Sequence, residues 1–187
     1  PWFSPELGVR SLPDWETLPY DVLSPQEDIV SERLETLYRM TSGTKGLDVV
    51  IASAVTAAQR MAPVAYVGAN TFFFRPGDTL SVEGLRSNLA AAGYAGVKQV
   101  LAAGEFAVRG SIIDVFPMGS DRPFRLDLFD DEIESIRWFD VETQRSMEAV
   151  NEIRLLPGHE FPVTPEAVTG FRQRWRTRFA GDPGKSL

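Results

Sequence analysis

Two arginines and one phenylalanine stand at positions where strand alternation places them on a polar face. The segment FRLDLF at 124–129 alternates strictly, so Phe124, Leu126 and Leu128 share one face, and the other face carries Arg125, Asp127 and Phe129. Residues 105–109 repeat this arrangement, with Arg109 on the polar side. A guanidinium group can form paired hydrogen bonds with a carboxylate, and Arg and aromatic side chains are enriched at protein interfaces. The pattern therefore predicts a surface that binds a protein partner; the alternative is a phenylalanine covered by a neighbouring helix.

Residue types that commonly serve catalysis or metal binding are scarce. The chain contains no cysteine, which excludes disulfide bonds, a thiol nucleophile and thiolate metal sites. Its single histidine, His159, lies in the loop sequence LPGHEFP. The acidic run at 130–134 lacks the spacing and the turn glycine of a calcium-binding loop, so we expect a hairpin turn with solvated carboxylates. The sequence shows no catalytic group of residues.

Two overlapping segments near the end of the chain have features of nucleotide or nucleic-acid sites. FAGDPGKS at 179–186 resembles a phosphate-binding loop, but Phe179 occupies the position of the first glycine and a helical pattern precedes it. FRQRWRTRF at 171–179 carries four arginines, and its aromatic residues recur every four positions, as on the inner face of a helix. The arginines spread around the remaining circumference, so we expect a solvated helix face there.

The composition of the 187 residues indicates a globular protein with one domain of moderate size or two small ones. Hydrophobic residues make up 43% and charged residues 24%, and no apolar run approaches the roughly 20 residues that span a bilayer. No signal peptide is evident, and we expect a cytoplasmic fragment of a longer protein. The net charge of -7 disfavours general binding to nucleic-acid phosphates.

The first part of the chain alternates strand and helix patterns. We expect a short strand and loop within 9–21, a helix that Ser24 caps, a buried strand at 47–53 and a short helix at 54–61. Strand, helix, strand and helix in this order predict a parallel α/β layer.

The pattern changes after about residue 71. Ser81 is the expected cap of a helix that ends at Gly93, and a further helix is expected at 165–179. Short turns between closely spaced strands predict an antiparallel meander, whose expected strands are 97–101, 105–109, 111–116, 124–129 and 132–139.

Several segments together resemble the N-terminal UvrB-homology module of the bacterial transcription-repair coupling factor family. They spread over most of the chain, up to HEFP at 159–162, and the strand motifs among them are also similar to the excision-repair protein UvrB. PDWETLPYD favours the coupling factors, because UvrB has a different sequence there. The segments are PDWETLPYD at 13–21, SPQEDIVSERL at 24–34, AGYAGVKQV at 92–100, GEFAVRGSIIDVFP at 104–117 and FRLDLFDDEIESIRWFDVETQRS at 124–146.

The resemblance implies an α/β fold with three parts. Residues 1–72 would form a partial RecA-like parallel α/β domain, and residues 73–156 would form an inserted α+β domain with an antiparallel sheet that docks UvrA. Residues 157–187 would re-enter the α/β framework. The resemblance assigns UvrA contacts to Arg109, Arg125 and Phe129, the residues selected above by alternation. Ser111 stands where many relatives have glycine or alanine, and this difference should not disturb the contact.

The resemblance also implies which functions lie elsewhere in the parent protein. The expected partner of this fragment is UvrA, whereas RNA polymerase and DNA would bind other domains of an ATP-dependent DNA translocase. ATP and magnesium would belong to distant motor domains, so we expect no cofactor and no enzymatic activity here. The alternatives are a fragment of UvrB, which should carry a tyrosine-rich hairpin, and a DNA-processing or nucleotide-binding fragment. The chain has four tyrosines and no such cluster.

Overall fold

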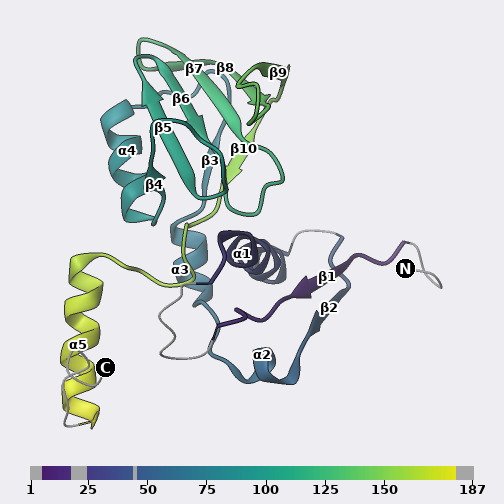
Figure 1. Ribbon diagram of the computed structural model, residues 1–187, viewed down its shortest axis with the longest axis vertical. Helices are drawn as coiled ribbons and strands as arrows, with labels where there is room; N and C mark the ends of the chain where they lie inside the picture. Colours follow the sequence, from purple (N-terminus) through teal and green to yellow (C-terminus); the bar gives the residue numbers. More distant parts are fainter. Residues whose placement is uncertain (1–5, 18–24, 44–45, 180–187) are drawn as a thin grey trace.

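The first structural unit is a small parallel α/β arrangement. A computed structural model describes residues 6–17, 25–43 and 46–179. Strand β1 (Val9–Leu12) pairs in parallel with β2 (Val49–Ala52), and helix α1 (Glu27–Ser42) connects them and packs on β1 (Figure 1). The predicted parallel α/β layer is therefore confirmed.

Helix α1 begins later than the sequence predicts. Its first residue is Glu27, and the residue before it, Gln26, has an extended backbone (φ -63°, ψ 140°) and makes no side-chain cap. An extended residue cannot continue a helix, so the helix does not start directly after Ser24, as a cap at that residue would require. Ser24 itself lies outside the described residues. The helix ends at Ser42 and is followed by Gly43, whose φ of 63° suits a residue without a Cβ.

Strand β2 forms as predicted but is not buried. The side chain of Ile51 is 60% exposed and that of Val49 is 40% exposed, so no described segment covers this face of the two-stranded sheet. Two short helices follow, α2 (Ala54–Ala58) and α3 (Val64–Ala69). The first is shorter than expected, and the second was not expected.

The second unit is built on a six-stranded sheet in the order β4-β5-β6-β7-β8-β9. All neighbours are antiparallel except the parallel pair of β4 and β5. The strands are β4 (Ala95–Gly96), β5 (Glu105–Arg109), β6 (Ile112–Val115), β7 (Phe124–Phe129), β8 (Glu132–Phe139) and β9 (Ser146–Ala149). A separate antiparallel pair, β3 (Phe72–Phe74) and β10 (Ile153–Leu155), lies where the chain enters and leaves this unit (Figure 1).

The predicted bounds of β5, β7 and β8 match the structure, but residues 97–101 do not form a strand. The chain pairs in parallel with β5 only through β4 and then bends away. Val100 turns inward and is buried against Ala107 and Phe139, which gives this segment its apolar signal without strand pairing. The fold class is thus mixed α/β with parallel and antiparallel sheets; the RecA-like assignment and the domain boundaries stay predictions.

Helix α4 (Val82–Ala91) supplies the main core with the sheet face that β5 to β8 present. Its buried residues Leu85 and Leu89 pack with Ile113, Leu126 and Ile136 in one cluster. Ser81 caps this helix by accepting a hydrogen bond from the amide of Gly84, as predicted. We call the opposite face of the six-stranded sheet the outer face.

Helix α5 (Pro165–Phe179) has the predicted bounds but buries none of its residues. The expected inner face is wrong within the described part of the chain, since Phe171 and Phe179 are at least half exposed. Their rings contact that of Trp175 instead, with centroids at 5.7 and 4.6 Å. The helix stands apart from all three described sheets (Figure 1). No described helix combines the length and the apolarity needed to cross a bilayer.

Candidate protein interface

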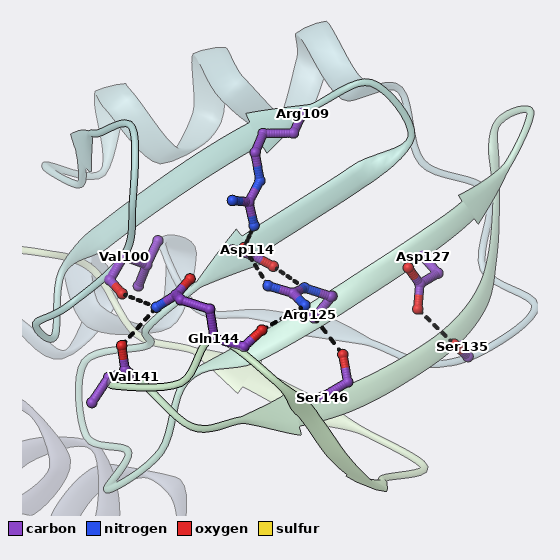
Figure 2. A network of polar contacts seen from close by, with 9 residues as sticks. All are labelled: Val100, Arg109, Asp114, Arg125, Asp127, Ser135, Val141, Gln144 and Ser146. Carbon is purple, nitrogen blue, oxygen red and sulfur yellow. Dashed lines mark hydrogen bonds and ion pairs between the residues drawn. The ribbon is translucent and has the colours of Figure 1, made fainter.

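The outer face brings Arg109 and Arg125 together at a carboxylate that lies between them. Asp114 is on β6, directly opposite Arg125 of β7 and next to β5, which carries Arg109. Figure 2 shows both guanidinium groups pointing toward the Asp114 carboxylate. Two of the three predicted site residues therefore form one cluster with an acidic residue that the prediction did not include.

Asp114 accepts hydrogen bonds on both carboxylate oxygens. Arg125 donates from Nε to Oδ1 at 2.6 Å and from Nη2 to Oδ2 at 2.9 Å, and Arg109 donates from Nη2 to Oδ2. The Asp114 side chain is only 1% exposed, so these contacts supply the counter-charge that a buried carboxylate needs. The hydrogen bond with Asp114 raises the pKa of Arg125 above its ordinary value, although burial opposes this effect.

Arg125 is fixed on several sides. Its Nη1 donates to the carbonyl of Gln144 and to the hydroxyl of Ser146, both at 3.2 Å, and its guanidinium lies 4.9 Å from the centre of the Phe139 ring. Its side chain is 13% exposed. Most of its donors are thus used within the protein, which leaves little of the group for a partner in this conformation.

The loop that receives Arg125 is itself held in place. Gln144 has a φ of 59°, and its side-chain nitrogen donates to the carbonyls of Val100 at 3.3 Å and Val141 at 2.8 Å (Figure 2). Asp140 accepts hydrogen bonds at 2.7 Å from the amide and the hydroxyl of Thr143, which lower the pKa of its carboxyl. These contacts orient the carbonyl that binds Arg125.

Arg109 shares the carboxylate but remains open to solvent. Its side chain is 46% exposed, against 13% for Arg125, and it binds one carboxylate oxygen through one nitrogen. Two guanidinium charges on one carboxylate leave the cluster with one excess positive charge. Arg109 is the member of the cluster that an incoming carboxylate can reach.

Phe129 lies at the end of the β7–β8 hairpin and projects into solvent. At 72% exposure it is the most exposed of the large apolar residues that the structure describes, so the alternative of a covering helix does not hold there. It pairs with Glu132 across a two-residue turn in which Asp130 has a φ of 52°. Phe129 lies four positions along β7 from Arg125, roughly 13 Å at the usual rise per residue.

Asp127 occupies the outer-face position between Arg125 and Phe129. Its carboxylate accepts a hydrogen bond from the Ser135 hydroxyl at 3.1 Å (Figure 2). The face therefore has two parts, an arginine cluster toward the sheet centre and an apolar ring at the hairpin end.

The sequence prediction missed Asp114 and Phe139, although a signal for the first was available. In IIDV at 112–115, alternation places Asp114 opposite to Ile113 and Val115, on the same face as the two arginines. Phe139 was harder to find, because the register of β7 and β8 shifts after Asp127. The burial pattern of β8 consequently does not alternate strictly.

Other candidate sites do not gain support from the structure. In residues 6–17, 25–43 and 46–179, no group of three or more potential ligands could hold a metal ion. All four acidic residues at 130–134 are exposed, and only Ile133 between them is buried. Of the phosphate-loop resemblance at 179–186, all but Phe179 lies outside the described residues. His159 stacks on Phe161, with centroids 6.5 Å apart, and lies against Gly93.

Comparisons with known proteins agree with this architecture. A model of the UvrB interaction domain family matches residues 72–161. The transcription-repair-coupling factors of Haemophilus influenzae and Escherichia coli are each 48% identical over 171 residues, or 91% of this chain and 15% of either relative. That of Staphylococcus aureus (strain USA300) is 34% identical over 174 residues, or 93% of this chain and 14% of the relative.

The chain thus spans about 15% of the length of the Haemophilus influenzae and Escherichia coli relatives. The similarity covers the α/β unit as well as the six-stranded sheet, since it extends over nine tenths of the chain. The resemblance to the transcription-repair coupling factors is confirmed, and within the chain residues 72–161 match the UvrB interaction domain family.

Proposed function

We propose that this chain is the UvrA-recruiting module of a transcription-repair coupling factor. The observation that carries the proposal is an exposed Phe129 on the same sheet face as a fixed pair of arginines. In the parent protein, this module links stalled RNA polymerase to nucleotide excision repair, while separate motor domains supply ATP-driven DNA translocation. The chain itself then acts by binding and not by catalysis.

The chemistry of the face fits a partner with an acidic group beside an apolar pocket. Arg109 is the accessible guanidinium and suits a partner carboxylate, and Phe129 suits a pocket that removes its ring from water. Arg125 is mostly buried behind Arg109 and contributes its positive charge to the face. Aromatic and arginine side chains are the residues that most often dominate the free energy of binding at interfaces.

Binding of purified Escherichia coli UvrA to the immobilised chain tests the proposal. We expect Phe129→Ala to raise Kd tenfold or more, since truncating an anchor costs about 2 kcal/mol or more and ~1.4 kcal/mol corresponds to a factor of ten. Phe171→Ala on α5 is the control, because it removes a half-exposed phenylalanine ring from another surface. Equal Kd values for Phe129→Ala and the unaltered chain would reject the proposed face.

A nucleotide titration separates the interaction module from a nucleotide-binding fragment. The proposal expects no saturable affinity of the isolated chain for ATP, with or without magnesium. A Kd in the micromolar range would instead support the nucleotide-binding alternative.

A further inference from the structure

We propose that Asp114 is a positioning residue of the docking face, which holds Arg109 and Arg125 in the orientation that UvrA recognises. This inference rests on the proposed function. Asp114 is buried and cannot itself contact a partner, yet it is the one residue that both arginines bind. It acts through the two guanidinium groups.

The hydrogen-bond geometry explains why a carboxylate is needed at this position. Three N–H groups from two arginines converge on two carboxylate oxygens, and an ionised carboxylate only accepts hydrogen bonds. An asparagine would present an NH₂ group to at least one arginine, so one guanidinium would lose its partner. Two neighbouring positive charges would then repel each other, and the more exposed Arg109 would move first.

A fixed arginine binds with less loss of conformational freedom than a mobile one. Arginine has several rotatable bonds, and immobilising such a side chain on association weakens affinity. Asp114, with the support of Gln144 and Ser146 for Arg125, immobilises these side chains before the partner arrives. The structure therefore contains a preorganised arginine cluster.

Charge alone predicts the opposite result of removing the carboxylate. The cluster would gain a full positive charge, and long-range attraction to an acidic partner would increase. Loss of positioning predicts weaker binding despite that additional charge. The sign of the change in Kd therefore distinguishes the two explanations.

The test measures Kd for Escherichia coli UvrA and the thermal unfolding of Asp114→Asn together with two matched controls. Glu83→Gln removes the same charge from an exposed position on helix α4, which packs on the opposite face of the sheet. Glu35→Gln removes a buried carboxylate from two other arginines, Arg39 and Arg154, away from the outer face. The first control isolates charge, and the second isolates loss of stability.

We expect Asp114→Asn to weaken UvrA binding about tenfold at a temperature where the chain is folded, the effect of freeing two long side chains. Glu83→Gln should bind UvrA as well as the unaltered chain or slightly better, and Glu35→Gln should melt earlier but bind normally. A Kd for Asp114→Asn equal to or below that of the unaltered chain overturns the inference.

A double-mutant cycle with Arg109→Gln tests whether Asp114 acts through that arginine. The effect of Asp114→Asn on Kd should shrink severalfold when Arg109 is already absent. Fully additive effects overturn the inference. If Asp114→Asn does not fold, Asp114→Glu keeps the charge but displaces the carboxylate by one methylene; we expect a severalfold higher Kd, and unchanged affinity overturns the inference.

The outcomes also separate this inference from the proposed function. If the unaltered chain does not bind UvrA, the proposed function fails before Asp114 is tested. If Phe129→Ala abolishes binding while Asp114→Asn binds as tightly as the unaltered chain, the proposed function stands and the positioning role of Asp114 falls.

Discussion

Two of the buried carboxylates that bind arginine, Glu160 and Asp114, do so in contrasting ways. Glu160 pairs through both oxygens with Arg33, and both side chains are buried. Asp114 is equally buried but binds two arginines, one of which is 46% exposed. The first pair is closed to solvent and electrically neutral, whereas the second cluster reaches the surface with an excess positive charge.

The difference in solvent exposure between the Arg33–Glu160 pair and the Asp114 cluster determines which of them can bind a partner. Glu160 also accepts a hydrogen bond from the Trp15 indole at 3.0 Å, and Arg33 lies 4.8 Å from the centre of that ring. The closed cluster thereby joins three distant parts of the sequence: the segment 13–17, helix α1 and the segment 159–161. This buried pair can stabilise the fold but cannot bind a partner. The open cluster has one more positive than negative charge, and it can present this excess charge to a partner.

The largest expected effect is on the stability of the closed pair. Arg33→Met should reduce the free energy of unfolding by about 3–5 kcal/mol, because it leaves the Glu160 carboxylate buried without a counter-charge. Urea unfolding followed by the fluorescence of Trp15 and the other tryptophans measures this. Arg33→Met combined with Glu160→Leu should recover part of the loss. A double variant no more stable than Arg33→Met would contradict this account.

The two faces of β7 should respond in opposite ways to truncation. Leu126→Ala should lower the free energy of unfolding by about 2–5 kcal/mol through loss of core packing, since Leu126 is fully buried. Phe129→Ala should change it by less than about 0.5 kcal/mol, as expected of an exposed site. Thermal melts of both variants, with UvrA affinity measured on the folded fraction, check the contrast. If Phe129→Ala melts the domain and leaves affinity intact, Phe129 belongs to the core.

The two arginines of the open cluster should differ in how well lysine replaces them. Arg125→Lys should cost about 1–2 kcal/mol of stability, because one ammonium group cannot reproduce contacts with Asp114, Gln144 and Ser146. Arg109→Lys should cost less than about 0.5 kcal/mol, since most of its side chain makes no equivalent set of contacts. Denaturant midpoints compare them. Equal losses would show that Arg109 is also a structural residue.

Local patterns predicted the outer face well because each strand there has one buried side. Alternation sufficed to set the bounds of β5 and β7 and to place Arg109 and Arg125 on one face. It did not reveal Asp114 as their common partner, since that contact depends on the register between three strands. Strand pairing across the sheet is a tertiary property that a single segment does not encode.

The other failures have physical causes of the same kind. The apolar run of β2 predicted a buried strand, but no described segment covers the face that carries Val49 and Ile51. The aromatic residues of α5 predicted an inner face, and they contact one another instead. Hydrophobic spacing shows which face of an element prefers to leave water, but it does not show what covers that face.

The smallest expected effect concerns arginines that neither cluster includes. Arg172 and Arg174 are exposed on α5, in contrast to the buried Arg33 and the shared Arg125. If they only face water, changing both to glutamine should leave any weak DNA binding almost unchanged. The measurement is the dependence of the binding constant on salt concentration in a log-log plot. A fall of about two in the slope, roughly one per lost phosphate contact, would show that these side chains bind the DNA backbone. Their exposure in the free chain would then mark a binding surface and not only a face in contact with water.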